Sequence, residues 1–314
     1  MILVISDIID QSEMEVYDWL NYLGARCEII SSIDFHQKIK LLYSNSNHEF
    51  TMFYGKDKFE KVSSLWIRRD RFSATNFLQS TISNDVSILL DFEADTLKDF
   101  ILNDKYNNIN LLSSYQNKKL NKLDVLEKAG DIGLNVPEYL ITNQKKYLQE
   151  FVLKHKKVIC KASFENLRFI ENDKAFFQYV EVLETDDLEK ITDSFFISFF
   201  QKYIYQKYEL RIFYFNGIVY AMANILRAGL TGDIRRTDYV TRKVPYVVNI
   251  NDSDKISKLM ENLNLNVGAL DFIIDENDKL YFLEVNPNGN FSNLSKSCNY
   301  NLEEIVANYL IYGK

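Results

Sequence analysis

The chain has 314 residues, of which 46% are hydrophobic and 26% are charged, and this balance is typical of a globular protein with two or three subdomains. Its net charge of −7 argues against nucleic-acid binding, and no apolar run approaches the roughly 20 residues of a membrane span. Three cysteines and three histidines are scattered without metal or redox spacing. The composition predicts a cytoplasmic protein that binds neither nucleic acid nor a membrane.

The N-terminal third predicts a small α/β domain. Its expected strands are 2–6, 27–31 and 64–70, and its expected helices are 12–24 and 87–102. Ser12 and Glu15 have the spacing of a capping box at the start of the first helix. The polar, asparagine-rich segment 106–114 interrupts this pattern and marks the first domain boundary.

The rest of the chain predicts helices mixed with longer strands. The expected helices are 117–129, 252–263 and 301–311, and the expected strands are 133–142, 156–162, 195–204, 208–215, 218–226, 267–274 and 279–285. Asn216 and Gly217 form the strongest short hairpin signal in the sequence.

The last two expected strands carry a possible metal site. A regular hairpin would place Asp271 opposite Phe282 and diagonal to Glu284, with Asn286 on the same face because strand side chains alternate. Acidic residues also occur on solvated strand faces, but the apolar neighbours of these residues argue for a buried sheet. Two carboxylates and an amide oxygen suit Mg²⁺, which completes its shell with water and nucleotide phosphates.

Two lysines and one strand end are candidates for nucleotide contacts. Lys161 ends an apolar strand, where a lone lysine is unusual, whereas Lys122 lies in a lysine-rich helix start, where a surface lysine is an equally good interpretation. A strand end able to present backbone groups to an adenine is formed by Gln201, Lys202, Tyr203 and Ile204.

The order of several motifs is more specific than any one of them. Along the chain run "NK" at a helix start, "G-x-x-V-P", a strand lysine, "Q-K-Y-I", "E-L-R" and "G-A-x-D-F…F-L-E-V-N-P-x-G". This order resembles that of the ATP-grasp ligases over nearly the whole chain. The resemblance implies an α/β and α+β architecture, with a pre-ATP-grasp domain at 1–110 and central and C-terminal ATP-grasp subdomains at 111–200 and 201–314.

The same resemblance implies roles for individual residues. ATP would lie between two α+β lobes, with Mg²⁺ on Asp271, Glu284 and Asn286, phosphates on Lys122 and Lys161, adenine at Gln201 to Ile204, and ribose near Glu209. Arg211 would face the reacting phosphate and acyl group. The loop after Lys161, ASFENLRF, has no glycines, whereas many ATP-grasp enzymes cover the phosphates with a glycine-rich loop. The resemblance therefore does not say which residues cover ATP.

Three further segments look like one branch of that family. SLWIRRD, NPNGNF and SKSCNYNLEEIVANYL are similar to segments of graspetide maturases of the microviridin and grasp-with-spasm type. Those enzymes join Asp or Glu side chains of a ribosomal precursor peptide to Ser, Thr or Lys side chains, forming macrocyclic esters or amides. The likeness implies a precursor peptide with a leader and an acidic core as partner, and a homodimer.

A basic segment in this acidic protein suits an acidic peptide. Segment 227–243 carries Arg227, Arg235, Arg236 and Arg242, and arginine binds carboxylates through two hydrogen bonds. A solvated loop with salt bridges is the alternative. We expect substrate binding there, with Asp238 positioning or deprotonating the incoming nucleophile. Trp66, Arg68 and Arg69 are candidates for leader contacts, although this strand also suits packing against the nucleotide lobe.

These features favour an ATP-dependent peptide macrocyclase that forms an acylphosphate, with Lys161 and Arg211 stabilising the transferred phosphate. Two alternatives remain open. One is a ligase that adds amino acids to a protein or peptide terminus, which would share all the ATP residues. The other is a peptide-binding module that keeps the shape without catalysis.

Overall fold

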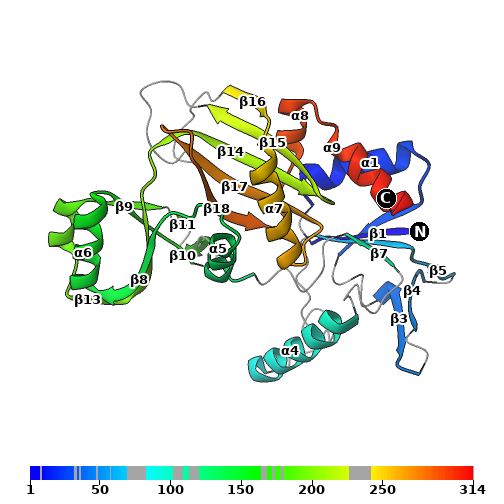
Figure 1. Ribbon diagram of the computed structural model, residues 1–314. Coiled ribbons are helices and arrows are strands. Elements are labelled where there is room, and N and C mark those ends of the chain that lie inside the picture. Colours follow the sequence, from blue (N-terminus) through cyan, green and yellow to red (C-terminus); the bar gives the residue numbers. More distant parts are fainter. Residues whose placement is uncertain are drawn as a thin grey trace.

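The structure is a computed structural model that describes residues 1–7, 9–31, 34, 37–46, 49–56, 58–68, 83–101, 109–112, 120–163, 168–171, 174–177, 180–225 and 242–313. Figure 1 shows an N-terminal region, a C-terminal antiparallel sheet in the middle, and a smaller central subdomain that projects away from both. In the described part of the chain, no helix combines the length and apolarity needed to cross a membrane.

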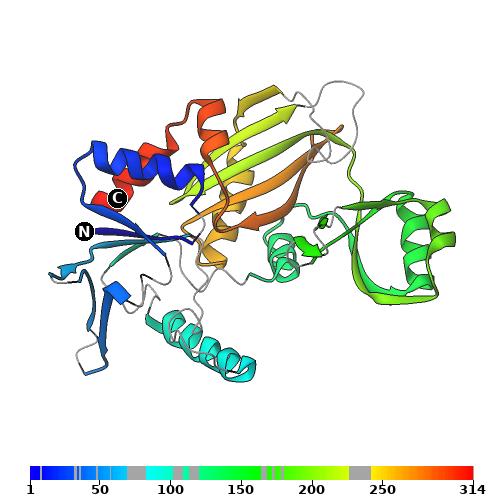
Figure 2. The same cartoon turned by 180° about the vertical axis from the view of Figure 1, so that it is seen from behind.

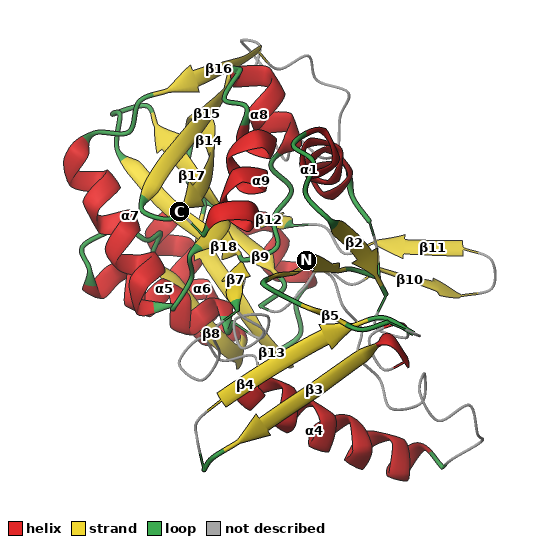
Figure 3. Ribbon diagram, turned by 90° about the vertical axis from the view of Figure 1, so that its right-hand side faces the viewer, coloured by secondary structure: helices red, strands yellow, loops and turns green. Residues whose placement is uncertain are grey.

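The N-terminal region contains the expected parallel sheet, with strand order β2-β1-β6-β7. Its elements are β1 (Ile2–Ile5), α1 (Gln11–Tyr22), β2 (Cys27–Ile30), β6 (Ser64–Ile67) and β7 (Asn110–Leu112). A separate antiparallel sheet and a long helix lie beside it (Figure 3), formed by β3 (Ile39–Ser44), β4 (Glu49–Tyr54), β5 (Glu60–Lys61) and α4 (Asn84–Ile101). The sequence analysis predicted α4 but not β3, β4 or β5.

The start of α1 differs from the prediction. Asp10 is the N-cap and forms a capping box with Glu13, so the box proposed for Ser12 and Glu15 is wrong. The helix begins two residues earlier than Ser12 would require, because the Asp10 side chain accepts from the Glu13 backbone N–H at 3.1 Å. Ser12 is instead fully buried within the first turn.

The central subdomain is a four-stranded antiparallel sheet with the order β12-β9-β13-β8. Its elements are β8 (Tyr139–Gln144), α6 (Lys145–His155), β9 (Val158–Lys161), β12 (Glu181–Leu183), a 3₁₀ helix (Thr185–Lys190) and β13 (Ser194–Lys202). Helix α6 covers one face through Leu148, Phe151 and Val152. The hairpin of β10 (Arg168–Glu171) and β11 (Lys174–Phe177) forms a sheet of its own.

The C-terminal sheet has five strands in the order β16-β15-β14-β17-β18, and its neighbouring strands are antiparallel. Its strands are β14 (Gln206–Phe215), β15 (Ile218–Ile225), β16 (Arg242–Tyr246), β17 (Val267–Asp275) and β18 (Leu280–Asn286). The predicted hairpin signal is confirmed, since Asn216 and Gly217 join β14 to β15 with φ angles of 44° and 87°. Helices α5 (Lys122–Asp131) and α7 (Ile250–Asn262) pack against one face of this sheet.

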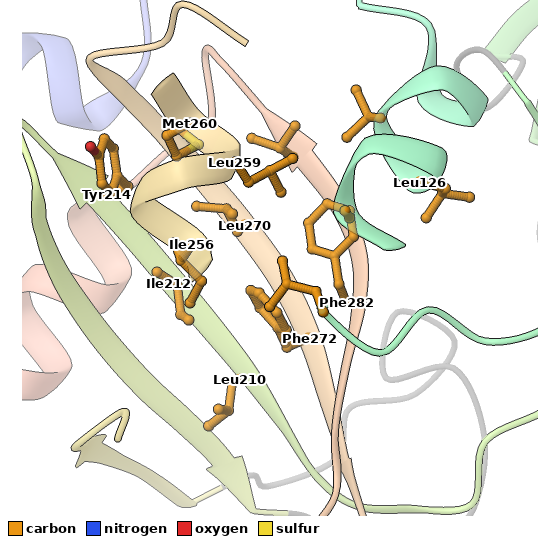
Figure 4. Close-up of a cluster of buried hydrophobic side chains, with 14 of the residues drawn as sticks. Leu126, Leu210, Ile212, Tyr214, Ile256, Leu259, Met260, Leu270, Phe272 and Phe282 are labelled. Atoms are coloured by element: carbon orange, nitrogen blue, oxygen red, sulfur yellow. The ribbon is translucent and has the colours of Figure 1, made fainter. Parts of the chain in front are cut away.

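That face holds a continuous apolar core (Figure 4). Leu126 of α5 and Ile256, Leu259 and Met260 of α7 meet strand residues that alternate along the sheet, namely Leu210, Ile212, Tyr214, Leu270, Phe272 and Phe282. Because alternate strand residues point to opposite faces, the residues between them lie on the other face. Glu209, Arg211, Phe213 and Phe215 are therefore on the face opposite to this core.

The two halves of that opposite face have different neighbours. Phe213 and Phe215 belong to a second core that includes helices α8 (Ser292–Cys298) and α9 (Leu302–Tyr312) together with β1 and α1. The two ends of the chain consequently lie close together, as Figure 2 shows from behind. Glu209 and Arg211 have no such apolar cover and face a cavity instead.

Several elements cross the domain boundaries expected at 110 and 200. Strand β7 pairs with β6 and extends the first sheet to Leu112, and β13 continues the central sheet to Lys202. Helix α5 packs mainly on the C-terminal sheet and also contacts Tyr139 of the central sheet through Glu127, while α9 joins the N-terminal core.

Candidate active site

A cavity of about 580 Å³ lies between the central sheet and the C-terminal sheet, within the range of roughly 300–1,000 Å³ common for small-molecule sites. The central sheet contributes Ile159, Lys161 and Gln201, and the C-terminal sheet contributes Glu209, Arg211, Asp271 and Glu284. Lys122, Lys202, Ile204, Met222, Asn224, Asn290 and Asn293 also line it. The cavity thus brings together nine of the residues predicted from the sequence.

The two candidate metal carboxylates lie directly opposite each other on neighbouring strands. Asp271 pairs with Glu284 because the register differs from the regular hairpin twice: the turn pairs Ile274 with Leu280 and not with Lys279, and Leu283 is an extra residue in β18. The diagonal arrangement expected for a regular hairpin is therefore wrong, while the pairing of Asp271 with Glu284 brings the carboxylates closer than expected. Asn286 follows two residues later on the same face, and its amide oxygen accepts from the Asn288 backbone N–H at 3.0 Å.

Each of these carboxylates is paired with a cation. Arg211 Nη1 forms a short salt bridge with Asp271 Oδ1, and Lys122 Nζ lies 3.1 Å from Glu284 Oε2. All four side chains are between about a quarter and a third exposed, so solvent and ligands reach them. In the described part of the chain, no three His, Cys, Asp or Glu side chains are grouped to hold a metal ion, so a metal here would rely on two carboxylates and an amide.

The adenine-binding segment predicted at the end of β13 borders the cavity only in part. Gln201 is 1% exposed; its Nε2 donates to the Pro137 carbonyl at 3.5 Å, and its buried Oε1 has no partner. The backbone N–H groups of Lys202 and Tyr203 donate to protein carbonyls and are already used. The Tyr203 ring contacts Tyr205 at 5.1 Å between centroids and does not line the cavity.

Lys161 occupies the end of β9, as predicted, and lies on the cavity face beside Phe199 of β13. Its Nζ is 5.5 Å from the centroid of the Phe199 ring. Lys161 and Lys122 therefore approach the same cavity from different elements, β9 and α5.

Asn224, Asn290 and Asn293 line the cavity and were missed by the sequence analysis. Asn224 pairs with Glu209 across β14 and β15, and its buried Oδ1 has no partner. Strand alternation from Glu209 would have found it, since the hairpin turn fixes this register. Asn290 and Asn293 carry no such signal, because they follow the irregular segment after β18.

Several predicted substrate contacts lie outside the described residues, namely Arg69, Arg227, Arg235, Arg236 and Asp238. Arg242 begins β16, is exposed, and pairs with Ile225. It does not line the cavity, whereas the next residue, Lys243, donates from Nζ to Asn293 Oδ1 at 2.8 Å.

The structure does not fit the leader contacts expected at Trp66 and Arg68. Both residues are 1% exposed. Arg68 forms salt bridges with Asp10 at 2.7 Å and Glu13 at 3.0 Å, so its charge is satisfied within the protein. Two buried side chains offer a peptide no surface. The alternative, packing of this strand against the nucleotide lobe, is supported for Trp66, which shares a core with Phe213 of the C-terminal sheet.

The protein has the ATP-grasp fold, as solved structures with this architecture match nearly the whole chain. The macrocyclase MdnC from Microcystis aeruginosa MRC, bound with its precursor peptide MdnA, matches with 19% identity, a TM-score of 0.77 and 99% coverage of both chains. A RiPP-associated ATP-grasp ligase from Chryseobacterium gregarium, in complex with ADP and a leader and core peptide, matches with 21% identity, a TM-score of 0.77 and coverage of 100% of this chain and 97% of that chain.

The ATP-grasp ligase PsnB, complexed with a minimal precursor, Mg and ADP, matches with 16% identity, a TM-score of 0.72 and coverage of 99% of this chain and 97% of that chain. No family model and no curated protein matches the sequence. The expected fold is confirmed, and it is shared at low sequence identity.

Proposed function

We propose that this protein is an ATP-dependent ligase that closes macrocycles in a ribosomal precursor peptide. The observation that carries the proposal is the polar cavity between two sheets, in which Asp271 and Glu284 face each other and each is paired with a cation. Three proteins with this fold were solved with precursor peptides, and two of these complexes also hold ADP.

The residues present fit ATP and Mg²⁺. The unpartnered Oε1 of Gln201 needs a donor, and the exocyclic amino group of adenine supplies one. Glu209 lies on the same face as Arg211, where it suits a ribose hydroxyl. Asp271, Glu284 and Asn286 would hold Mg²⁺, which supplies positive charge for the phosphates. Once metal and phosphates are bound, Lys122 and Lys161 would turn to the phosphate oxygens.

The proposed reaction has two steps. In the first, a carboxylate oxygen of a peptide Asp or Glu attacks the γ-phosphorus of ATP, the bond to the bridging oxygen breaks, and ADP leaves. Lys161 and Arg211 stabilise the charge on the transferred group. In the second, a Ser or Thr hydroxyl or a Lys amine attacks the acyl carbon and phosphate departs, with Asp238 taking the proton of the nucleophile. The product is an ester or an amide.

We propose that the basic segment 227–243 recognises the peptide. Its arginines, Arg227, Arg235, Arg236 and Arg242, would bind the acidic core through paired hydrogen bonds. Arg69 remains a proposed leader contact. We also propose a cytoplasmic homodimer, for which light scattering on the purified protein measures the mass.

The test is the intact mass of a precursor peptide co-expressed with this protein. Losses of one water per ring that depend on ATP, and that vanish with Glu284→Gln, are the expected result. A mass gain equal to an added amino acid would instead identify a ligase acting on a peptide terminus. Peptide binding with no mass change, together with ATP binding without hydrolysis, would identify a non-catalytic module.

A further inference from the structure

The loop that joins β18 to α8, residues 287–291, is held from outside by the N-terminal region. It follows the candidate metal ligand Asn286 and leads to Asn290 and Asn293, which line the cavity. Two buried residues far away in sequence, Ser12 and Arg68, bond to the main chain of this segment. The candidate active site therefore depends on contacts that its own sheets do not make.

Ser12 holds the end of the loop. Its Oγ accepts from the backbone N–H groups of Phe291 and Ser292, both at 3.1 Å, and the residue is 0% exposed. A second helix residue adds to this contact, because Ser292 Oγ donates to Glu15 Oε2 at 2.6 Å. The first turns of α1 thus fix the start of α8.

Arg68 holds the middle of the loop. Its Nη1 donates to the Gly289 carbonyl at 3.4 Å, while Nη2 and Nε bond Asp10 and Glu13. Those two carboxylates are themselves fixed by the capping box of α1. Because the guanidinium is planar and held on two sides, the direction of its third contact is set as well.

Gly289 also lies next to Arg211, which lines the cavity. A Cβ atom on this glycine would lie 2.3 Å from Ala269 Cβ and 3.2 Å from Arg211 Nη2. The backbone N–H of Gly289 donates to the Asn286 carbonyl at 3.1 Å. Gly289 is thus packed between Arg68 behind the loop and Arg211 in front of it, next to Asn286.

We propose that Ser12 and Arg68 are positioning residues of the active site, which hold this loop so that Arg211 keeps its place at the cavity and Asn286 keeps its place at the end of β18. The proposal rests on the proposed function for the chemistry of the site. It assigns the N-terminal region a part in the phosphoryl and acyl transfer steps, in addition to any peptide binding. Neither residue touches the reacting groups, so both act through the loop.

A matched pair of serines separates positioning from simple stabilisation. Ser6 is 3% exposed and donates from Oγ at 3.0 Å to Glu13 Oε1, the oxygen that also accepts from Arg68 Nε, so it belongs to the same buried network and reaches the loop only through Glu13 and Arg68. Ser12→Ala and Ser6→Ala each remove one buried hydroxyl from the N-terminal region. Only Ser12→Ala removes an acceptor from the loop.

Three readouts are measured on the full chain with both variants: hydrogen exchange at Phe291 and Ser292, the Mg²⁺ dependence of ADP affinity, and the rate of water loss from a precursor peptide. For Ser12→Ala we expect amide hydrogen exchange at Phe291 and Ser292 to become at least about tenfold faster. We expect kcat to fall about tenfold while the KM for peptide stays unchanged. We also expect the gain in ADP affinity on adding Mg²⁺ to shrink. Ser6→Ala, which acts on the loop only through Glu13 and Arg68, should change each of the three readouts much less than Ser12→Ala, with a comparable fall in Tm.

Equal effects of the two variants on the three readouts would overturn the proposal. If the wild-type protein closes no ring in any peptide, the proposed function fails, and the exchange and Mg²⁺ readouts still decide the role of Ser12. Should Ser12→Ala not fold, Ser12→Cys keeps the size of the side chain with a weaker acceptor and is measured in its place. Arg68→Lys, which keeps the charge but loses the planar guanidinium, should repeat the loss of kcat.

Discussion

Lys122 Nζ lies 3.1 Å from Glu284 Oε2, so a lysine at the start of α5 neutralises a carboxylate at the end of β18. Arg211 does the same for Asp271 on the neighbouring strand. The two carboxylates proposed to hold a metal ion are thus each paired with a side-chain cation. A bound metal ion would compete with these cations for the carboxylates, and phosphates would compete with the carboxylates for the cations. This arrangement keeps two adjacent carboxylates from repelling each other before nucleotide binds.

Replacing Lys122 should weaken nucleotide binding more than the fold. Lys122→Ala removes a partner that is about one third exposed, and such pairs contribute only about 0–1 kcal/mol to stability. We expect the KM for ATP to rise roughly tenfold or more, since a charge-assisted phosphate contact is lost. Lys128→Ala, on the same helix and paired with Asp124, is the control for ATP kinetics; an equal rise in KM there would contradict a phosphate contact at Lys122.

Replacing Gln201 with an apolar residue should maintain or raise the stability of the protein but lower its affinity for nucleotide. Its buried Oε1 has no partner, and an unsatisfied buried acceptor costs about 1–3 kcal/mol. Gln201→Met keeps a similar volume, so the melting temperature of the nucleotide-free protein should stay the same or rise while ATP affinity falls about tenfold. Calorimetric titration together with thermal unfolding measures both. A variant that loses stability and keeps its affinity would rule out the proposed adenine contact.

Gly289→Ala should disturb Arg211 directly. The added methyl would sit 2.3 Å from Ala269 Cβ, far inside van der Waals contact, so either β17 or the loop must shift. We expect about 1–3 kcal/mol of lost stability and a strong loss of ATP turnover. The control is Gly130→Ala in α5, where a Cβ meets nothing within 4 Å and the helix should gain up to about 1 kcal/mol. Full turnover in Gly289→Ala would show that the position of Arg211 is not critical.

Arg68→Ala should be among the most destabilising substitutions of a charged residue in this protein. It removes the guanidinium that is paired with the fully buried Glu13 and with Asp10, and breaking a buried pair costs about 3–5 kcal/mol. Arg26→Ala provides the contrast, because Arg26 is largely exposed and its bridge to Glu60 should contribute less than about 1 kcal/mol. Urea unfolding of both variants gives the two free energies, and similar values would contradict the structural role of Arg68.

Cys27 should resist alkylation in the folded protein. Burial, followed by the nearby charge of Glu28, raises the pKa of its thiol to about 11. A thiol with that pKa is only roughly 0.1% thiolate at pH 8, and the thiolate is the reactive form. Burial also raises the pKa of Cys160 and Cys298. Iodoacetamide at pH 8 should therefore label these cysteines quickly only after denaturation, and rapid labelling of Cys27 in native protein would contradict its burial.

The fold and much of the candidate site follow from local sequence signals. Strand alternation and the Asn216-Gly217 turn fix which residues of β14 and β15 share a face, and the motif in β17 and β18 places Asp271 and Glu284 together. The exact pairing was missed for two reasons: the turn pairs Ile274 with Leu280 and not with Lys279, and Leu283 is an extra residue whose bulge depends on packing that no local pattern encodes.

The contacts of the N-terminal region were harder to predict, for a different physical reason. Ser12 is a residue type that often caps helices, and Arg68 is one that often contacts ligands on the surface. Both are in fact buried, and both bond to elements more than 200 residues further along the chain. Tertiary burial decides their roles, and a single sequence does not record it.

The packing of α9 has a consequence for the order in which the protein is made. The first strand, with Ile2 and Val4, shares a core with Leu302, Val306 and Leu310 of the last helix. During synthesis, Val16 and Leu20 of α1 are available to this core early, but the core stays incomplete until residues 302–310 have emerged. A chain that stops before α9 lacks the part of this core that Leu302, Val306 and Leu310 supply, so the N-terminal region completes its packing only after α9 has been made.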